Sequence, residues 1–385
     1  MTTPRVAEKR PGFISLTAGL VLAILFVVFA LQTWTRATRI NGNDLTTYLT
    51  AARAFWAGGN PYLVDAPFPF IYPLFLCVAI WPLAQLPYGA AIAAWYLLAI
   101  LALASATNLL RVLERPAPDA RRWLMATAIV ALALTDVLQN NLVNGQVNAV
   151  VLGLCVVLAW LHARGKRLAA GIALGAAIAL KLTPAVLLMF LVKRKDWRTI
   201  AWTAAATLVC AVGLPYLIAG SSVWTEYQFY ARTFLTDRLV DSADIVTHHR
   251  AFGLVEVVRQ LTGAAMAADT WIAAALVAMA LWATDRPDRP HAFALYLAAS
   301  LLMSPMSEVH HLILLWPGLI GLTWAALAGR LSAAYIVGVA AVLIAVLAIR
   351  YVPFAAFVAV TGTCVLLILV KQPAVRPSTA GPAST

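Results

Sequence analysis

Charge is scarce in this chain. Charged side chains make up 11% of its 385 residues, about half the share found in soluble globular domains. Hydrophobic residues make up 62%, and the uncharged segment 13–34 is long enough to cross the ~30 Å apolar core of a bilayer. A lipid-exposed sheet is excluded, because its edges would leave backbone groups unpaired. The composition therefore predicts a polytopic α-helical membrane protein.

Signatures of several other protein classes are absent. The segment 13–34 lacks a small-residue cleavage site and is too long for a removed signal peptide, so we expect a retained signal anchor. The cysteines form no Cys-x-x-Cys pair and all lie in apolar segments, which argues against a disulfide framework and a cysteine metal site. These residues are Cys77, Cys155, Cys210 and Cys364.

The apolar runs predict an all-α fold with about twelve spans. The expected spans lie near 13–34, 70–87, 89–110, 123–139, 146–162, 168–192, 199–219, 265–284, 291–305, 312–329, 332–349 and 354–370. We expect a single transmembrane domain over 1–370. The polar, Pro-rich tail 371–385 is expected to be disordered in the cytoplasm.

Positive charge exceeds negative charge, with 28 Lys and Arg against 16 Asp and Glu. The basic residues cluster at the ends of the spans, which indicates topology control and lipid headgroup contact, and we expect no nucleic-acid partner. With the first cluster in the cytoplasm, the long loops 35–69 and 220–264 fall on the outer side. Counting the spans in the same way also places the basic loops 111–122 and 163–167 outside, although basic loops usually lie in the cytoplasm. The side of the membrane on which these two loops lie is therefore left undecided.

An acid follows the first span. From Asp44 onward, apolar residues recur at spacings of three and four over 45–55, which predicts an amphipathic helix able to lie on the membrane surface. A carboxylate is favourable at a helix N-terminus. Asp44 is therefore either a helix cap, with Asn43 as a competitor, or a reactive group fixed at the start of the helix.

A lysine stands inside a long apolar run. Lys181 lies in the expected span 168–192, and Pro184 after it should break or kink the helix. A lysine at that depth needs an anionic partner. We consider Asp136 and a bound phosphate as alternatives.

Two histidines and an acid gather at the outer end of a later span. Adjacent side chains point about 100° apart on a helix, so we expect at most one of His310 and His311 to face a given cavity. Neighbouring histidines do not converge on one metal ion as an i, i+4 pair does. Together with Glu308 they favour hydrogen bonding toward a phosphate, or alternatively an interfacial polar cluster.

Two polar segments complete the candidates. Amides are concentrated over 135–150, where Asn144-Gly145 is a turn signal, and the plain interpretation is a polar turn between helices. Arg250 lies in the second long outer loop, where it is either ordinary surface charge or a contact to a membrane-bound phosphate.

In this order, these stretches resemble glycosyltransferase family 87, whose members include mycobacterial polyprenol-phosphate-mannose-dependent α-1,2-mannosyltransferases. The matching stretches are Asp44-x3-Tyr48 with Gly58, Gly59 and Pro61-Tyr62; Tyr72-Pro73; Asn144-Gly145-Gln146; Lys181-x2-Pro184 with KRKDW; and Ser304-Pro305 with His310-His311. They span roughly residues 40–320. One departure is Glu308, which stands where the family commonly has Trp, and it bears on which sugar the cavity holds.

The resemblance implies a GT-C fold in a multi-pass protein of a bacterial plasma membrane, with its site facing outward. It implies a polyprenyl-phosphate sugar, most simply mannose, as donor and a lipid-linked glycan or glycolipid as acceptor. No nucleotide-binding glycine fingerprint is present, and we expect no cofactor and no metal. An inverting transfer needs one general base, for which Asp44 is the candidate. Candidate phosphate ligands are His310, His311, Lys181 and Arg250; candidate substrate contacts are Tyr48, Tyr62, Asn144, Gln146 and Glu308.

Two alternatives remain at this stage. In the first alternative, the donor carries arabinofuranose in place of mannose, because members of the family differ in the sugar that they transfer. Alternatively the chain is a lipid or polysaccharide transporter, which kinked spans and an intramembrane lysine would suit. The two halves of the chain show no corresponding broken segments, which disfavours the transporter.

Overall fold

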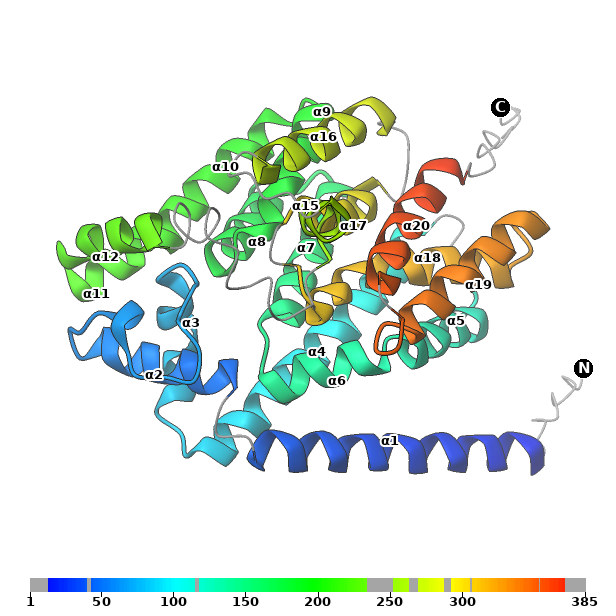
Figure 1. Ribbon diagram of the computed structural model, residues 1–385, viewed down its shortest axis with the longest axis horizontal. Helices are drawn as coiled ribbons and strands as arrows, with labels where there is room; N and C mark the ends of the chain where they lie inside the picture. Colours follow the sequence, from blue (N-terminus) through cyan, green and yellow to red (C-terminus); the bar gives the residue numbers. More distant parts are fainter. Residues whose placement is uncertain are drawn as a thin grey trace, which may run out of the picture.

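The computed structural model describes residues 13–39, 43–114, 118–233, 252–262, 269–286, 292–304, 307–352 and 354–370. Every regular element among these residues is helical, which confirms the all-α prediction (Figure 1). Each of the expected spans contains a helix. Arg250 and the tail 371–385 lie outside the described residues.

The helices of the first half follow the predicted order. They are α1 (Phe13–Arg39), α2 (Asp44–Trp56), η1 (Pro61–Leu63), α3 (Phe75–Ala84), α4 (Tyr88–Leu113), α5 (Ala120–Ala133), α6 (Thr135–Asn144), α7 (Asn148–His162), α8 (Arg167–Leu180), η2 (Thr183–Val186) and α9 (Leu187–Lys193). In Figure 1, α1 lies along one side of the bundle, next to α6.

The second half is also a succession of helices, most of them apolar. They are α10 (Trp197–Leu208), η3 (Val209–Gly213), α11 (Leu214–Ala219), α12 (Ser222–Tyr230), α15 (Leu254–Thr262), α16 (Asp269–Thr284), α17 (Ala292–Met303), η5 (Val309–Leu315), α18 (Trp316–Leu327), α19 (Ala333–Leu347) and α20 (Ala355–Leu369).

Many of the spans are short or broken. Within the described residues, three continuous helical segments are long and apolar enough to cross a bilayer alone: 88–113, 197–219 and 309–327. The pair α5 and α6, bent by 68°, passes the same test together, and other apolar helices have 10–17 residues. Lys181 and Pro184 mark one such break, between α8 and η2, as the sequence predicted. The fold is that of a polytopic membrane protein whose helix breaks admit polar groups.

Close packing of α8 on α10 shows how the apolar helices associate. A Cβ on Gly171 would lie 2.4 Å from the Cβ of Trp202, and one on Gly175 would lie 2.6 Å from the Cβ of Ala206. Small residues four apart let two helices approach closely where the hydrophobic effect offers no drive between them. The same contact fixes the C-terminal end of α8, from which Lys181 projects.

The loop 35–69 is folded into the bundle. The apolar face of α2 packs against α3, with Leu45, Tyr48 and Phe55 each 1% exposed. Trp56 and Trp81 stack at the far end, with ring centroids 4.8 Å apart. The face that we expected to rest on the membrane surface is therefore covered by protein, and α2 holds its N-terminus in a fixed place.

Candidate active site

Asn43 caps α2 and leaves Asp44 available. The side-chain oxygen of Asn43 accepts the backbone N–H of Thr46 at 2.9 Å, and its amide donates to the carbonyl of Val143 at 3.2 Å. Asp44 is the first residue of the helix. Of the two candidate N-caps, Asn43 is the one that caps α2. The carboxylate of Asp44 is therefore not needed to cap the start of the helix.

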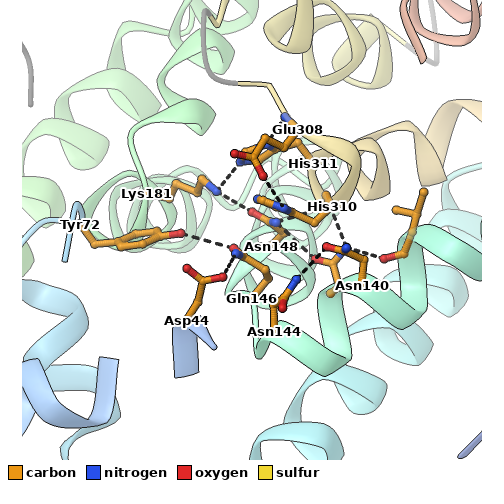
Figure 2. A network of polar contacts seen from close by, with 12 residues as sticks. Asp44, Tyr72, Asn140, Asn144, Gln146, Asn148, Lys181, Glu308, His310 and His311 are labelled. Carbon is orange, nitrogen blue, oxygen red and sulfur yellow. Dashed lines mark hydrogen bonds and ion pairs between the residues drawn. The ribbon is translucent and has the colours of Figure 1, made fainter. Parts of the chain in front are cut away.

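A glycine turn brings a second segment to Asp44. Gly145 ends α6 in the left-handed region, with φ 65°. A Cβ at this position would lie 2.4 Å from the Cβ of Leu45, so only glycine lets the turn lie against the start of α2. The next residue, Gln146, then donates from Nε2 to Oδ2 of Asp44 at 2.6 Å (Figure 2).

Two buried tyrosines extend this contact. The hydroxyl of Tyr48 donates to the hydroxyl of Tyr72 at 2.8 Å, and Tyr72 donates to Oε1 of Gln146 at 3.3 Å. Tyr48 lies one helical turn after Asp44 on α2, so the two side chains are on the same face of the helix. Tyr72 belongs to the loop before α3 and was part of the sequence pattern, but its role as a hydrogen-bond partner was not predicted.

Lys181 faces the same network from α8. Its Nζ donates to Oδ1 of Asn148 at 2.8 Å and lies 2.8 Å from Nε2 of His311. It also lies 5.5 Å from the ring centroid of Tyr72, within reach of a cation–π contact. Asp136 is not its partner: that carboxylate lies 3.3 Å from Arg350.

Both histidines belong to the cluster. They are the second and third residues of η5, a 3₁₀ segment, and their ring centroids lie 4.1 Å apart. Nδ1 of His311 accepts the backbone N–H of Glu308 at 2.9 Å, and Nδ1 of His310 lies 3.6 Å from the Glu308 carboxylate. The expectation that at most one would face the cavity is wrong, because both rings turn toward Glu308 and so lie side by side.

Asparagines tie η5 to α6 and α7. The backbone carbonyl of His310 accepts from Nδ2 of Asn141 at 2.7 Å and of Asn148 at 3.4 Å. Asn148 thus connects His310 and Lys181, a role that sequence reasoning missed (Figure 2). The signal was present, because Asn148 is an amide at the start of the otherwise apolar α7.

Burial sets the acidity of Asp44. Desolvation raises the pKa of its carboxyl from 3.8 to about 6. The Gln146 hydrogen bond and the positive charge of Lys181 work in the opposite direction, and the nearby Glu308 carboxylate adds to the rise. A carboxylate with this pKa is ionised at neutral pH and still basic enough to accept a proton from a hydroxyl group during a reaction.

Two further predicted contacts, Tyr62 and Asn144, have hydrogen-bond partners other than Asp44. The hydroxyl of Tyr62 donates to the backbone carbonyl of Tyr72 at 3.1 Å, and its ring packs against Phe70 and Tyr230. Asn144 donates to the side-chain oxygen of Asn140 at 3.0 Å at the end of α6.

Comparison with known proteins gives a consistent result. Residues 70–307 match the model of Glycosyltransferase family 87. A polyprenol-phosphate-mannose-dependent alpha-(1-2)-phosphatidylinositol mannoside mannosyltransferase of Mycobacterium tuberculosis is 30% identical over 304 residues, covering 72% of this chain and 69% of the relative. The protein of the same description from Mycolicibacterium smegmatis is 29% identical over 347 residues, covering 79% and 76%.

A third relative is named a pentamannoside mannosyltransferase. This polyprenol-phosphate-mannose-dependent alpha-(1-2)-phosphatidylinositol pentamannoside mannosyltransferase of Mycobacterium tuberculosis is 26% identical over 351 residues, covering 84% of this chain and 74% of the relative. Among solved structures, ArnT from Cupriavidus metallidurans bound to undecaprenyl phosphate matches with a TM-score of 0.40 and 15% identity, covering 90% of this chain and 76% of that one.

Proposed function

The chain belongs to glycosyltransferase family 87, and from that premise we propose that it transfers mannose from a polyprenyl-phosphate donor to a lipid-linked glycan or glycolipid. The relatives' names specify a polyprenol-phosphate-mannose donor and phosphatidylinositol mannoside acceptors. The proposed reaction takes place on the outer face, where the loop 35–69 falls by charge counting. The transporter interpretation is not carried further, because the named relatives are transferases.

The observation that carries the proposal is the placement of Asp44 opposite Lys181 within one network. Asp44 and its partner Gln146 lie at one end, and Lys181 with His311 lies at the other (Figure 2). Sugar transfer from a lipid phosphate needs a base for the incoming hydroxyl and positive charge for the departing phosphate. The two ends of the network supply these two groups.

The reaction proceeds as one displacement at the anomeric carbon. Asp44 accepts the proton of an acceptor hydroxyl as the hydroxyl oxygen forms a bond to the anomeric carbon. The bond from that carbon to the phosphate oxygen breaks, and its electron pair leaves with the lipid phosphate. The configuration inverts. The phosphate is already a good leaving group, so no carboxylic acid need protonate it, unlike the leaving group in a glycosidase.

The hydrogen bonds of His311 favour phosphate binding beside Lys181. Because Nδ1 of His311 accepts a backbone N–H, the neutral ring carries its proton on Nε2, which faces Nζ of Lys181. Two donors 2.8 Å apart cannot satisfy each other. A phosphate oxygen accepts from both, and its negative charge is stabilised by the ammonium group. His310 and Arg250 remain proposed additional ligands.

Transfer is expected to fall in acid with a midpoint near the pKa of Asp44. The base works only as the carboxylate, so the rate is constant well above pH 6 and about tenfold lower one pH unit below the midpoint. Initial rates over a pH series check this, with the donor incubated alone to measure its own acid hydrolysis. A midpoint near the ordinary carboxyl pKa would show that a different or solvated acid limits the rate.

Chelation is expected to leave the rate unchanged. In this proposal Lys181 supplies the positive charge for the leaving phosphate and His311 donates a hydrogen bond to it. The nearest acid after Asp44 in the sequence is Asp65, too far along the chain for an Asp-x-Asp metal pair. Initial rates with EDTA, compared with rates in excess Mg²⁺ and Mn²⁺, test this. Loss of transfer on chelation, restored by one of these ions, would contradict it.

A donor panel tests the function directly. The purified chain in lipid vesicles is supplied with a phosphatidylinositol mannoside acceptor and labelled polyprenyl-phosphate mannose, polyprenyl-phosphate arabinofuranose or a nucleotide-linked mannose. We expect label in the glycolipid fraction from polyprenyl-phosphate mannose alone. Label from the arabinofuranose donor would favour the alternative sugar, and label from the nucleotide donor would overturn the lipid-donor assignment.

A further inference from the structure

A chain of hydrogen bonds holds Asp44, and α2 closes it into a ring because Tyr48 and Asp44 lie one turn apart on that helix. It runs from Tyr48, on the same helix as Asp44, to the hydroxyl of Tyr72 at 2.8 Å and on to Oε1 of Gln146 at 3.3 Å. It closes from Nε2 of Gln146 to Oδ2 of Asp44 at 2.6 Å. Three segments distant in the sequence meet in this ring: α2, the loop before α3 and the turn between α6 and α7.

Both tyrosine hydroxyls face the amide oxygen of Gln146. The hydroxyl of Tyr72 lies 3.3 Å from Oε1 and that of Tyr48 lies 3.5 Å from it, and the two hydroxyls lie 2.8 Å apart. Because these hydroxyls donate and an amide nitrogen does not accept, they turn the amide oxygen toward the tyrosines and the amide nitrogen toward Asp44. The orientation of an amide is fixed by such partners. Donors that point the same way along a buried chain also strengthen one another.

Little water can replace these contacts. Gln146 is 4% exposed, Tyr48 1% and Tyr72 6%. Removing the amide would leave Oδ2 of Asp44 half-buried without its donor, which penalises the carboxylate more than the protonated acid. The other charged groups that act on Asp44 are Lys181, which favours the carboxylate, and Glu308, which opposes it.

We propose that Gln146 is a positioning residue, which aims Asp44 at the acceptor hydroxyl and holds it as the carboxylate, with the hydroxyls of Tyr72 and Tyr48 fixing the orientation of the amide. The inference rests on the proposed role of Asp44 as the base. It assigns to Gln146 a contact with Asp44 in place of the substrate contact expected from the sequence. Gln146 itself acts through Asp44 and forms no bond to the reacting atoms.

The test is the pH dependence of mannosyl transfer by Gln146→Leu. The midpoint of the acid limb is expected to move upward by about 1–2 pH units, so that rate lost near neutral pH returns in alkaline solution. The matched control is Gln139→Leu, which removes the same amide from α6, where it accepts from Arg36 at 2.8 Å. The control should keep the wild-type midpoint.

A second variant separates orientation from folding. Tyr72→Phe keeps the amide but removes the nearer of its two hydroxyl donors and leaves Tyr48 at 3.5 Å from Oε1, so a smaller upward shift is expected. If Gln146→Leu does not fold, as judged by its thermal melting, the shift in Tyr72→Phe decides. A rate lowered equally at every pH, with an unchanged midpoint in the folded variants, overturns the proposal. Absence of transfer by the wild-type chain is a separate result, which overturns the proposed function itself.

Discussion

Asp44→Asn is expected to lower sugar transfer by about 10²- to 10⁴-fold, the usual contribution of a positioned general base, while the protein remains folded. Asparagine has nearly the same shape and cannot accept the proton of the acceptor hydroxyl. Its side-chain oxygen can still accept from Nε2 of Gln146, so the ring around α2 is retained. Initial rates at saturating donor and acceptor measure the loss.

Stability should not fall in this variant. The carboxylate of Asp44 is held at a desolvation cost, which is the main cause of its raised pKa, and a neutral amide avoids that cost. Thermal melting in the same detergent is expected to be equal to that of the wild type or higher. Asp65→Asn is the matched control, because Asp65 is an exposed acid in the same loop. Near-normal turnover by Asp44→Asn would remove it as the base and direct attention to Glu308.

Lys181→Met is expected to lower kcat by about 10²- to 10³-fold, the range found when one donor to a developing negative charge is removed. Methionine keeps the length and apolar stem of lysine but carries no charge at the break between α8 and η2. The departing phosphate then gains its negative charge beside Asn148 and His311 without an ammonium group. The donor concentration that gives the half-maximal rate should also rise.

Lys193→Met is the control for this prediction. Lys193 ends α9, near Lys181 in the sequence, and its Nζ donates to the backbone carbonyl of Trp282 at 2.7 Å. Loss of that contact should leave transfer unchanged. If Lys181→Met changes melting temperature alone and keeps both kcat and the donor dependence, then Lys181 is a structural partner of Asn148 and the phosphate site lies elsewhere.

The class of fold could be predicted from the sequence, and so could the ionisable residues at the two ends of the network, Asp44 and Lys181. Long uncharged segments specify spans because charge at bilayer depth is costly, and the break at Pro184 was readable because proline removes a helix hydrogen bond. Asp44, Lys181 and the histidines stood out as ionisable groups beside apolar runs. Each of these signals is local in the chain, so a single sequence contains it.

The pairings within the site were not readable in the same way. Lys181 contacts Asn148 and His311, which lie 33 and 130 residues away in the sequence. From the sequence alone, Asp136 was an equally reasonable partner. The choice depends on which face of α6 and α7 turns toward α8. Likewise, the selection of Asn43 as cap depends on its contact with Val143, about a hundred residues along the chain.

The most direct test of the central claim measures the new glycosidic bond and the released polyprenyl phosphate in the same experiment. Purified chain in sealed vesicles is given polyprenyl-phosphate mannose, labelled in the sugar, with a glycolipid acceptor. We expect an α-mannosyl glycolipid, inverted relative to a β-linked donor, and one polyprenyl phosphate released for each sugar transferred, with both lost in Asp44→Asn. Labelled donor that crosses the bilayer intact, or product that forms equally in Asp44→Asn, would contradict the account.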